Sequence, residues 1–136
     1  MNQPTVRLSS PASLPKPMGY SHLAEVTAGK LVYIAGQVPQ DASGALIGEN
    51  DFRAQVTQVF SNLNLAVKAA GGSFADIVKL NYFCVERMSP ADLPILREVR
   101  DQFVNVNAPP VSSLIVVSRL VRPEWLIEIE AIAVIA

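Results

Sequence analysis

The chain has 136 residues, a length that fits one domain with a continuous core and needs no disulfide or structural metal. Its 11 Lys and Arg residues against 12 Asp and Glu residues give a formal net charge of -1, which argues against a broad electrostatic attraction to nucleic acid. Hydrophobic residues make up 50% of the chain and charged residues only 17%, so we expect copies of the chain to cover part of each other's surface in a homo-oligomer.

The N-terminal sequence lacks a basic segment followed by an apolar stretch, and no run approaches the roughly 20 apolar residues that span a bilayer. We therefore expect a cytoplasmic protein with no membrane partner. Cys84 is the single cysteine and lies in an apolar run, so it is interpreted as a small buried hydrophobe. One His and one Cys cannot build the usual zinc sites, and no phosphate-binding glycine loop is present, so neither a metal nor a cofactor is expected.

The N-terminal segment is rich in proline. Four prolines among serines and alanines predict that residues 1–19 form an extended arm, with at most a short strand at Thr5 to Leu8. The compact part of the single domain is then expected to start near Tyr20.

Strand patterns follow the arm. Residues 23–26 and 31–35 are predicted to be two strands joined tightly, with Gly29 in the turn where a positive φ is needed. Pro39 ends the second strand, and a further short strand is predicted at residues 45–47.

The clearest helix pattern lies in the middle of the chain. Apolar residues recur at spacings of three and four over residues 52–70, as on a helix that packs one face on a sheet. Asn50 or Asp51 can cap the start of this helix, and Gly71 and Gly72 supply a left-handed exit at its end. The apolar run at residues 77–85 is predicted to be a central strand.

A second helix is predicted to start near Asp92, because Pro94 is tolerated only in the first turn of a helix. Its apolar face carries Leu96, Val99 and Phe103. Strands at residues 109–117 and 126–134 complete the order β-β-β-α-β-α-β-β. This order predicts an α+β fold, with a mixed sheet that has both helices on one face and an apolar second face that needs a partner.

The last strand contains two acids in an otherwise apolar sequence. Alternation places Glu128 and Glu130 on one face and their isoleucine and alanine neighbours on the other. Burying an unpaired carboxylate is costly, so the two acids mark either a solvated or interface-paired face or a functional site. Both interpretations remain open from the residues alone.

Four runs, at residues 19–21, 31–39, 69–79 and 128–134, together resemble the reactive intermediate deaminase family, also called Rid, YjgF or L-PSP. The match covers roughly residues 17–136. The resemblance implies a chorismate-mutase-like α+β fold assembled as a homotrimer, with three equivalent clefts between neighbouring subunits. In active members these clefts hydrolyse short-lived 2-imino acids, or their enamine tautomers, to 2-oxo acids and ammonia.

The resemblance also implies site residues. Glu128 falls on the family glutamate that positions or activates water, Tyr20 falls on the family tyrosine, and Gly36 falls on the glycine whose backbone approaches the ligand. His22 is added because it projects to the same side as Tyr20 in an extended segment. The predicted catalytic residues are Glu128 and Tyr20, and the predicted substrate-binding residues are Gly36, Ser112, Leu114 and His22.

Position 112 departs from the family pattern, because Ser112 stands where the family has the arginine of a Pro-Ala-Arg-Ser stretch. Arginine binds a carboxylate through a planar charged fork, whereas serine offers one neutral donor. Losing one partner of a desolvated charge pair costs about 2 to 5 kcal/mol. Arg119 or Arg122 of a neighbouring subunit is a less favoured replacement, because charged residues beside turns are usually solvated.

These observations leave three candidate functions. The first is a trimer that hydrolyses an imine, an enamine or a related small reactive metabolite, with its specificity altered by Ser112. The second is a non-catalytic trimer that binds a small metabolite or a protein partner in the same cleft. The third, endoribonuclease activity, is disfavoured by the charge balance and by the lack of a basic stripe.

Overall fold

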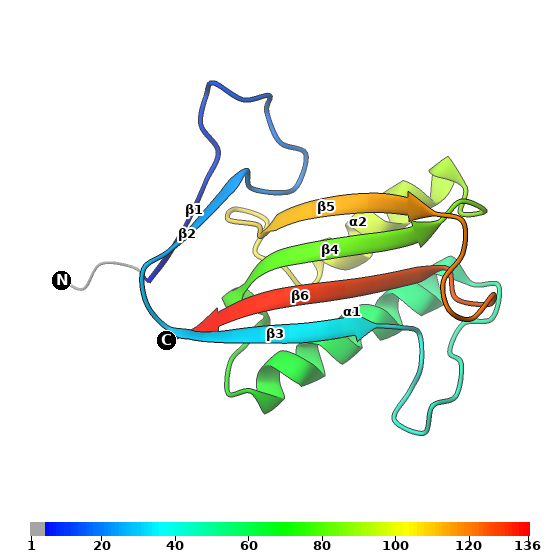
Figure 1. Ribbon diagram of the computed structural model, residues 1–136. Coiled ribbons are helices and arrows are strands. Elements are labelled where there is room, and N and C mark those ends of the chain that lie inside the picture. The colour runs from blue at the N-terminus through cyan, green and yellow to red at the C-terminus, as the bar shows by residue number, and fades with distance from the viewer. Residues whose placement is uncertain (1–4) are drawn as a thin grey trace.

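The structure is a computed structural model that describes residues 5–136, so the first four residues of the predicted arm lie outside it. Helices α1 (Phe52–Ala69) and α2 (Leu93–Asp101) pack on one face of a four-stranded sheet, and a small two-stranded sheet lies beside it (Figure 1). The predicted α+β fold with both helices on one face is confirmed.

The main sheet has the strand order β3-β6-β4-β5. Its strands are β3 (Lys30–Gln37), β4 (Ile77–Val85), β5 (Val111–Val117) and β6 (Ile127–Ile135). β6 runs antiparallel to both of its neighbours, whereas β4 and β5 are parallel because α2 forms part of the crossover between them. The sheet is therefore mixed, and β4 is an interior strand, as predicted.

The tight strand pair expected across Gly29 is not formed. β2 (Leu23–Val26) pairs with β1 (Val6–Ser9) in the two-stranded sheet, and β3 pairs with β6. Gly29 does have a positive φ of 120°, but its turn carries the chain from one sheet into the other. The nine-residue β6 offers β3 a longer partner than the four-residue β2 could.

Two smaller expectations also need correction. The short strand of the arm is present as β1, and because β1 is paired, ordered structure begins well before Tyr20. Residues 45–47 do not form a strand, since Leu46 makes only an isolated bridge with Gln40. A single bridge is too short to continue as a ladder between two turns.

α1 begins and ends as predicted. The Asp51 side chain accepts a hydrogen bond from the Ala54 N–H at 3.1 Å, and Gly71 just beyond the helix has a φ of 95°. The face toward the sheet is fully apolar except for Gln55, which is completely buried. Its amide donates to the Gly48 and Glu124 carbonyls and accepts from the Leu126 N–H.

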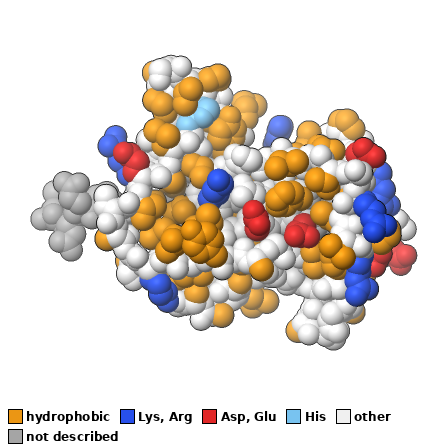
Figure 2. All heavy atoms as spheres, viewed as in Figure 1, with side chains coloured by type: hydrophobic (Ala, Val, Ile, Leu, Met, Phe, Trp, Pro, Cys, Tyr) orange, Lys and Arg blue, Asp and Glu red, His pale blue; other side chains and the backbone are white. Residues whose placement is uncertain are grey.

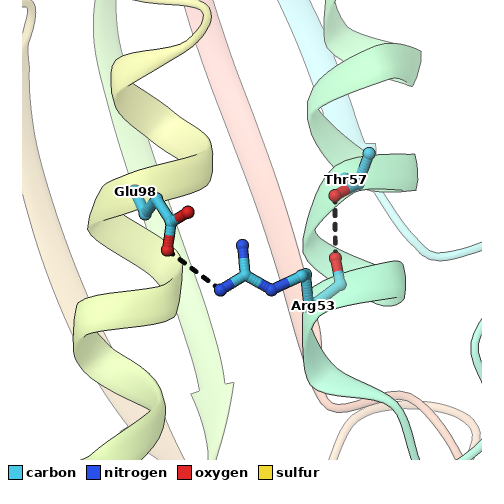
Figure 3. A network of polar contacts seen from close by, with 3 residues as sticks. All are labelled: Arg53, Thr57 and Glu98. Carbon is cyan, nitrogen blue, oxygen red and sulfur yellow. Dashed lines mark hydrogen bonds and ion pairs between the residues drawn. The ribbon is translucent and has the colours of Figure 1, made fainter.

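α2 is shorter than predicted. It follows a 3-10 turn at Pro90–Asp92, accepts Pro94 in its first turn, and ends at Asp101. Phe103 therefore lies beyond the helix, yet its ring still stacks on Phe60 of α1 at 5.4 Å between centroids. An exposed ion pair of 2.9 Å between Arg53 and Glu98 also joins the two helices (Figure 3).

The core lies between the helices and the sheet. Cys84 is completely buried there, and burial raises the pKa of its thiol to about 11, which confirms its structural role. Tyr82 and Trp125 are also buried. Within residues 5–136 there is no cluster of three or more His, Cys, Asp or Glu that could hold a metal ion, and no helix is long and apolar enough to cross a membrane.

The second face of the sheet carries no helix. Tyr33 and Leu31 of β3 are 73% and 54% exposed on this face, and Ile115 of β5 is also exposed. Figure 2 shows this face, where acidic groups lie among apolar side chains over the sheet. The predicted apolar second face is present, and a surface of this kind is typical of a subunit interface.

Candidate functional site

The segment before β2 joins the edge of the main sheet at the start of β5. The Ser21 hydroxyl donates to the Pro109 carbonyl at 2.6 Å, and the Ser21 N–H donates to the Pro110 carbonyl at 3.2 Å. Ser21 also forms a parallel bridge with Val111. These contacts hold Tyr20, the preceding residue, next to the first residues of β5.

A cavity of about 320 Å³ lies between this segment, α2 and the β5 edge. Tyr20, Ser112 and Leu114, three of the predicted site residues, all line it. Its remaining lining residues are Met18, Tyr82, Leu93, Leu96, Arg97 and Arg100.

The register of β5 on β4 fixes the side of the sheet on which this cavity opens. Ser112 pairs with Leu80, and Leu114 pairs with Tyr82. Leu80 and Tyr82 face the helices in the core, and directly paired residues project to the same face. Ser112 and Leu114 therefore project toward the helix side of the sheet, where α2 leaves the edge strand partly open.

Glu128 lies on the opposite face. It pairs with Phe83, whose side chain is directed away from the core, and its carboxylate lies directly over Gly36, so that a Cβ at position 36 would overlap it. The register of β3 on β6 shifts between Ile34 and Gln37, a bulge that brings the Gly36 backbone to this point. The absence of a side chain at Gly36 thus makes room for the carboxylate.

The Glu128 carboxyl has an unusual environment. Partial burial, and secondly the negative charge of Glu130, raise its pKa above the ordinary range. Glu130 itself accepts a hydrogen bond from the Asn81 amide at 3.1 Å. Within the described chain Glu128 has neither an ion pair nor a side-chain hydrogen bond, and a partly desolvated carboxylate of this kind can accept a proton from water.

The predicted site residues therefore form two groups on opposite faces of the sheet. Tyr20, Ser112 and Leu114 share the cavity at the β5 edge, whereas Glu128 and Gly36 share the uncovered face. Strand alternation separates the groups, because position 112 has the orientation of the core residues and position 128 has the reverse. A single subunit does not bring all of these residues into one cleft.

His22 belongs to neither group. Its Nε2 lies 2.7 Å from the Pro15 carbonyl oxygen, and its ring makes an edge contact with Tyr20 at 5.3 Å between centroids. His22 is on the same segment as Tyr20, as expected, but it does not line the cavity. Its contacts hold the arm in place.

The two arginines considered as replacements for the family arginine lie elsewhere in the subunit. Arg119 is exposed, and the Arg122 guanidinium lies 5.8 Å from the centre of the Trp125 ring. Neither lines the cavity of its own subunit.

Sequence reasoning missed the two arginines that do line the cavity, Arg97 and Arg100 of α2. A signal for them was present, because Leu93, Leu96, Arg97 and Arg100 follow the spacing of one helix face. That signal becomes informative only once α2 is known to pack beside β5.

Comparison with known proteins gives a consistent result. The family model described as endoribonuclease L-PSP matches residues 12–135. A RutC family protein of Pyrococcus horikoshii is 35% identical over 120 residues, covering 88% of this chain and 90% of the relative. The 2-iminobutanoate/2-iminopropanoate deaminase of Salmonella typhimurium is 36% identical over 110 residues, covering 80% and 83% of the two chains.

A solved structure is also similar. It is that of YyfB from Yersinia pestis, a protein of unknown function in the conserved Rid family. It has a TM-score of 0.87 and 36% sequence identity, and the match covers 96% of this chain and 99% of that one.

Proposed function

Because this chain belongs to the endoribonuclease L-PSP family, which includes the Rid proteins, we propose that it hydrolyses a small imine or enamine to a carbonyl compound and ammonia. Its 36% identity to an imine deaminase over 110 residues supports this chemistry. We further propose that the reaction occurs in clefts between the subunits of a homotrimer.

The observation that carries this proposal is the position of Glu128. A carboxylate with a raised pKa, next to a glycine backbone and open to the uncovered face, is suited to act as a general base. It would take a proton from water as the water oxygen bonds to the imine carbon. That proton passes to the nitrogen and gives a carbinolamine. The hydroxyl proton of the carbinolamine is then also transferred to the nitrogen, the carbon–nitrogen bond breaks, and ammonia leaves as the carbonyl group forms.

The division of the site residues between two faces supports assembly. Tyr20 and Ser112 at the β5 edge of one subunit would complete the site of a neighbour whose Glu128 lies on its uncovered face. The exposed Leu31 and Tyr33 supply apolar surface for such an interface. A trimer would therefore bury the uncovered face and form a cleft from both groups at once.

Ser112 is the observation that favours a second function. Without a cation at this position, the cleft of a trimer could hold a metabolite and yet not hydrolyse a 2-imino acid. The two functions differ in whether Glu128 is needed for turnover. Ribonuclease activity has less support, because a net charge of -1 gives the chain no overall electrostatic attraction to a phosphate backbone.

A coupled assay separates these functions. An L-amino-acid oxidase generates 2-imino acids, and the release of 2-oxo acid and ammonia is followed with the wild-type chain, Glu128→Gln and Ser112→Arg. We expect the wild type to accelerate hydrolysis. Glu128→Gln should lower the catalysed rate by at least about 100-fold, which is the usual range for loss of a general base.

Two controls complete this experiment. Glu25→Gln changes an exposed acid of β2 and should leave the rate unchanged. Unaltered hydrolysis by Glu128→Gln would contradict the proposed base, and no acceleration by the wild type or by Ser112→Arg would favour the binding function. Light scattering of the wild type tests the trimer, and a monomer would contradict the intersubunit cleft.

A further inference from the structure

The cavity at the β5 edge combines positive charge with apolar side chains. Arg97 and Arg100 lie on the side formed by α2, together with Leu93 and Leu96, while Ser112 and Leu114 form the opposite side. Small-molecule sites typically have this composition, with a few polar groups set among apolar ones. Its volume of about 320 Å³ suits a ligand of a few carbon atoms.

Arg100 is the cation that the fold holds in place. Its side chain is only 15% exposed, and its Nε donates to the Asp101 carboxylate at 2.9 Å. The far end of the guanidinium lies against Gly19, whose φ is +80° and where a Cβ would overlap the Nη atoms. Arg100 thus lies between the arm and the cavity, where Asp101 orients it and Gly19 leaves room for its guanidinium.

The Arg100 fork is only partly used. Within residues 5–136, Nη1 and Nη2 have no hydrogen-bond acceptor, although both are donors. A largely buried guanidinium with free terminal donors is matched by the two oxygens of a carboxylate.

Tyr82 provides a second, independent observation. Its side chain is 4% exposed, and its hydroxyl is buried without a hydrogen-bond partner in the described chain. Tyr82 lines the same cavity as Arg100. Buried hydroxyl groups are nearly always hydrogen-bonded, so this one is an unmet polar group beside the cavity, although it is not itself open to it.

We propose that Arg100 binds the carboxylate of the substrate, in place of the arginine that the family pattern expects at position 112. The inference rests on the proposed function for the nature of the substrate, which is then a small 2-imino or enamine carboxylate with an apolar side chain. The Ser112 hydroxyl adds a neutral hydrogen bond, and Leu93, Leu96 and Leu114 contact the apolar part.

The short side chain of Ser112 fits this assignment. An arginine at position 112 would place another positive charge in a cavity that already contains Arg97 and Arg100, and like charges at close range repel. Arg100 on α2 therefore supplies the cation, and the small Ser112 side chain on β5 leaves room for the ligand. In the double variant Ser112→Arg/Arg100→Gln, the arginine at position 112 should bind the carboxylate from the opposite wall and restore the affinity that Arg100→Gln loses.

The test uses 2-oxobutanoate, a product-like carboxylate, in calorimetric titrations of the full-length chain. Arg100→Gln should weaken its binding by at least about 30-fold, the loss expected when one partner of a desolvated charge pair is removed. Arg100→Lys should recover part of the affinity, because the charge remains and the fork is lost. Arg53→Gln removes an exposed arginine from α1, outside the cavity, and should leave binding unchanged.

The outcomes separate this inference from the proposed function. If Arg100→Gln binds 2-oxobutanoate as tightly as the wild type, or if the wild type does not bind it saturably, the carboxylate site is wrong. If Arg100→Gln weakens binding while no variant hydrolyses imines, the site stands and the deaminase proposal fails. If Glu128→Gln abolishes hydrolysis and Arg100→Gln leaves KM unchanged, the deaminase stands and the Arg100 assignment fails. Unchanged thermal unfolding of Arg100→Lys provides the check on folding.

Discussion

The two faces of the four-stranded sheet are built by the same strands but have different roles. On β6, Ile127 and Ile129 are completely buried under the helices, whereas Glu128 and Glu130 alternate with them on the uncovered face. The covered face is almost wholly apolar, and the uncovered face mixes apolar patches with acids. Stability therefore comes mainly from the covered face, whereas the proposed assembly and chemistry use the other face.

The largest expected effect tests the covered face. The Phe60 ring is completely buried and contacts Phe74, Tyr82 and Phe103. Phe60→Ala removes this ring and leaves a cavity, so it should lower the free energy of unfolding by about 3 to 5 kcal/mol. Urea denaturation measures the change. Leu65→Ala, on the exposed side of the same helix, is the control and should stay within about 0.5 kcal/mol of the wild type.

The next effect concerns the one polar side chain in the helix face. Gln55→Leu should cost about 1 to 3 kcal/mol, because the buried Leu126 N–H loses its acceptor. The Gly48 and Glu124 carbonyls also lose the donor that the Gln55 amide supplies. Gln102→Ala changes an exposed glutamine and serves as the control in the same denaturation experiment. If Gln55→Leu leaves the free energy of unfolding unchanged, the hydrogen bonds of Gln55 add nothing to stability beyond what apolar contacts would give.

The uncovered face should respond in assembly rather than in folding. Tyr33→Asp places a charge on the exposed apolar surface and should shift the chain toward monomers, with its circular dichroism spectrum unchanged. Light scattering measures the oligomer. Leu65→Asp makes the same kind of change on the helix layer and should leave the oligomer intact. If Tyr33→Asp assembles as the wild type does, the interface lies elsewhere.

The acids of the uncovered face should set the pH dependence. Partial burial and Glu130 raise the pKa of Glu128, so hydrolysis that needs the ionised base should fall off at a higher pH than an ordinary glutamate would give. Glu130→Gln removes one cause, so the acid limb of the pH–rate profile should move to lower pH. A limb that stays in place would show that Glu128 is not the group that titrates.

The smallest effect is on stability at Glu128 itself. A carboxyl whose pKa is raised in the fold stabilises the protein below the ordinary glutamate pKa of about 4.3, and that contribution is lost as pH rises through the raised value. Glu128→Gln should therefore be slightly more stable than the wild type at neutral pH, with the difference shrinking in acid. Thermal unfolding across this range measures it, with Glu25→Gln as the exposed control.

Local patterns were sufficient to predict much of this fold. The spacing of apolar residues gave α1, and the turn glycines at positions 29 and 71 have the positive φ that was expected. The pairing of β2 with β1 could not be read from the chain, because pairing depends on which distant strand offers the longer apolar partner.

The site was predicted less completely than the fold. The family pattern pointed to Glu128, Gly36, Tyr20 and Ser112 one by one, and the structure adds that Glu128 lies over Gly36 and that Tyr20 and Ser112 line one cavity. It could not give Arg100, because this residue becomes a wall of the cavity only when α2, β5 and the arm meet. Nor did alternation alone reveal that position 112 and position 128 face opposite sides, since that depends on the registers of β5 and β6 on β4.

The place of β6 in the sheet has a consequence for how the chain is made. β6 follows every other strand in sequence, yet it lies between β3 and β4, which do not pair with each other. While the ribosome is still adding residues before Ile127, β3 and β4 must wait with unpaired edges, and α1 has no complete sheet to cover. Folding of the nascent chain should thus be a late and cooperative event, with exposed apolar strands that chaperones can recognise until β6 inserts.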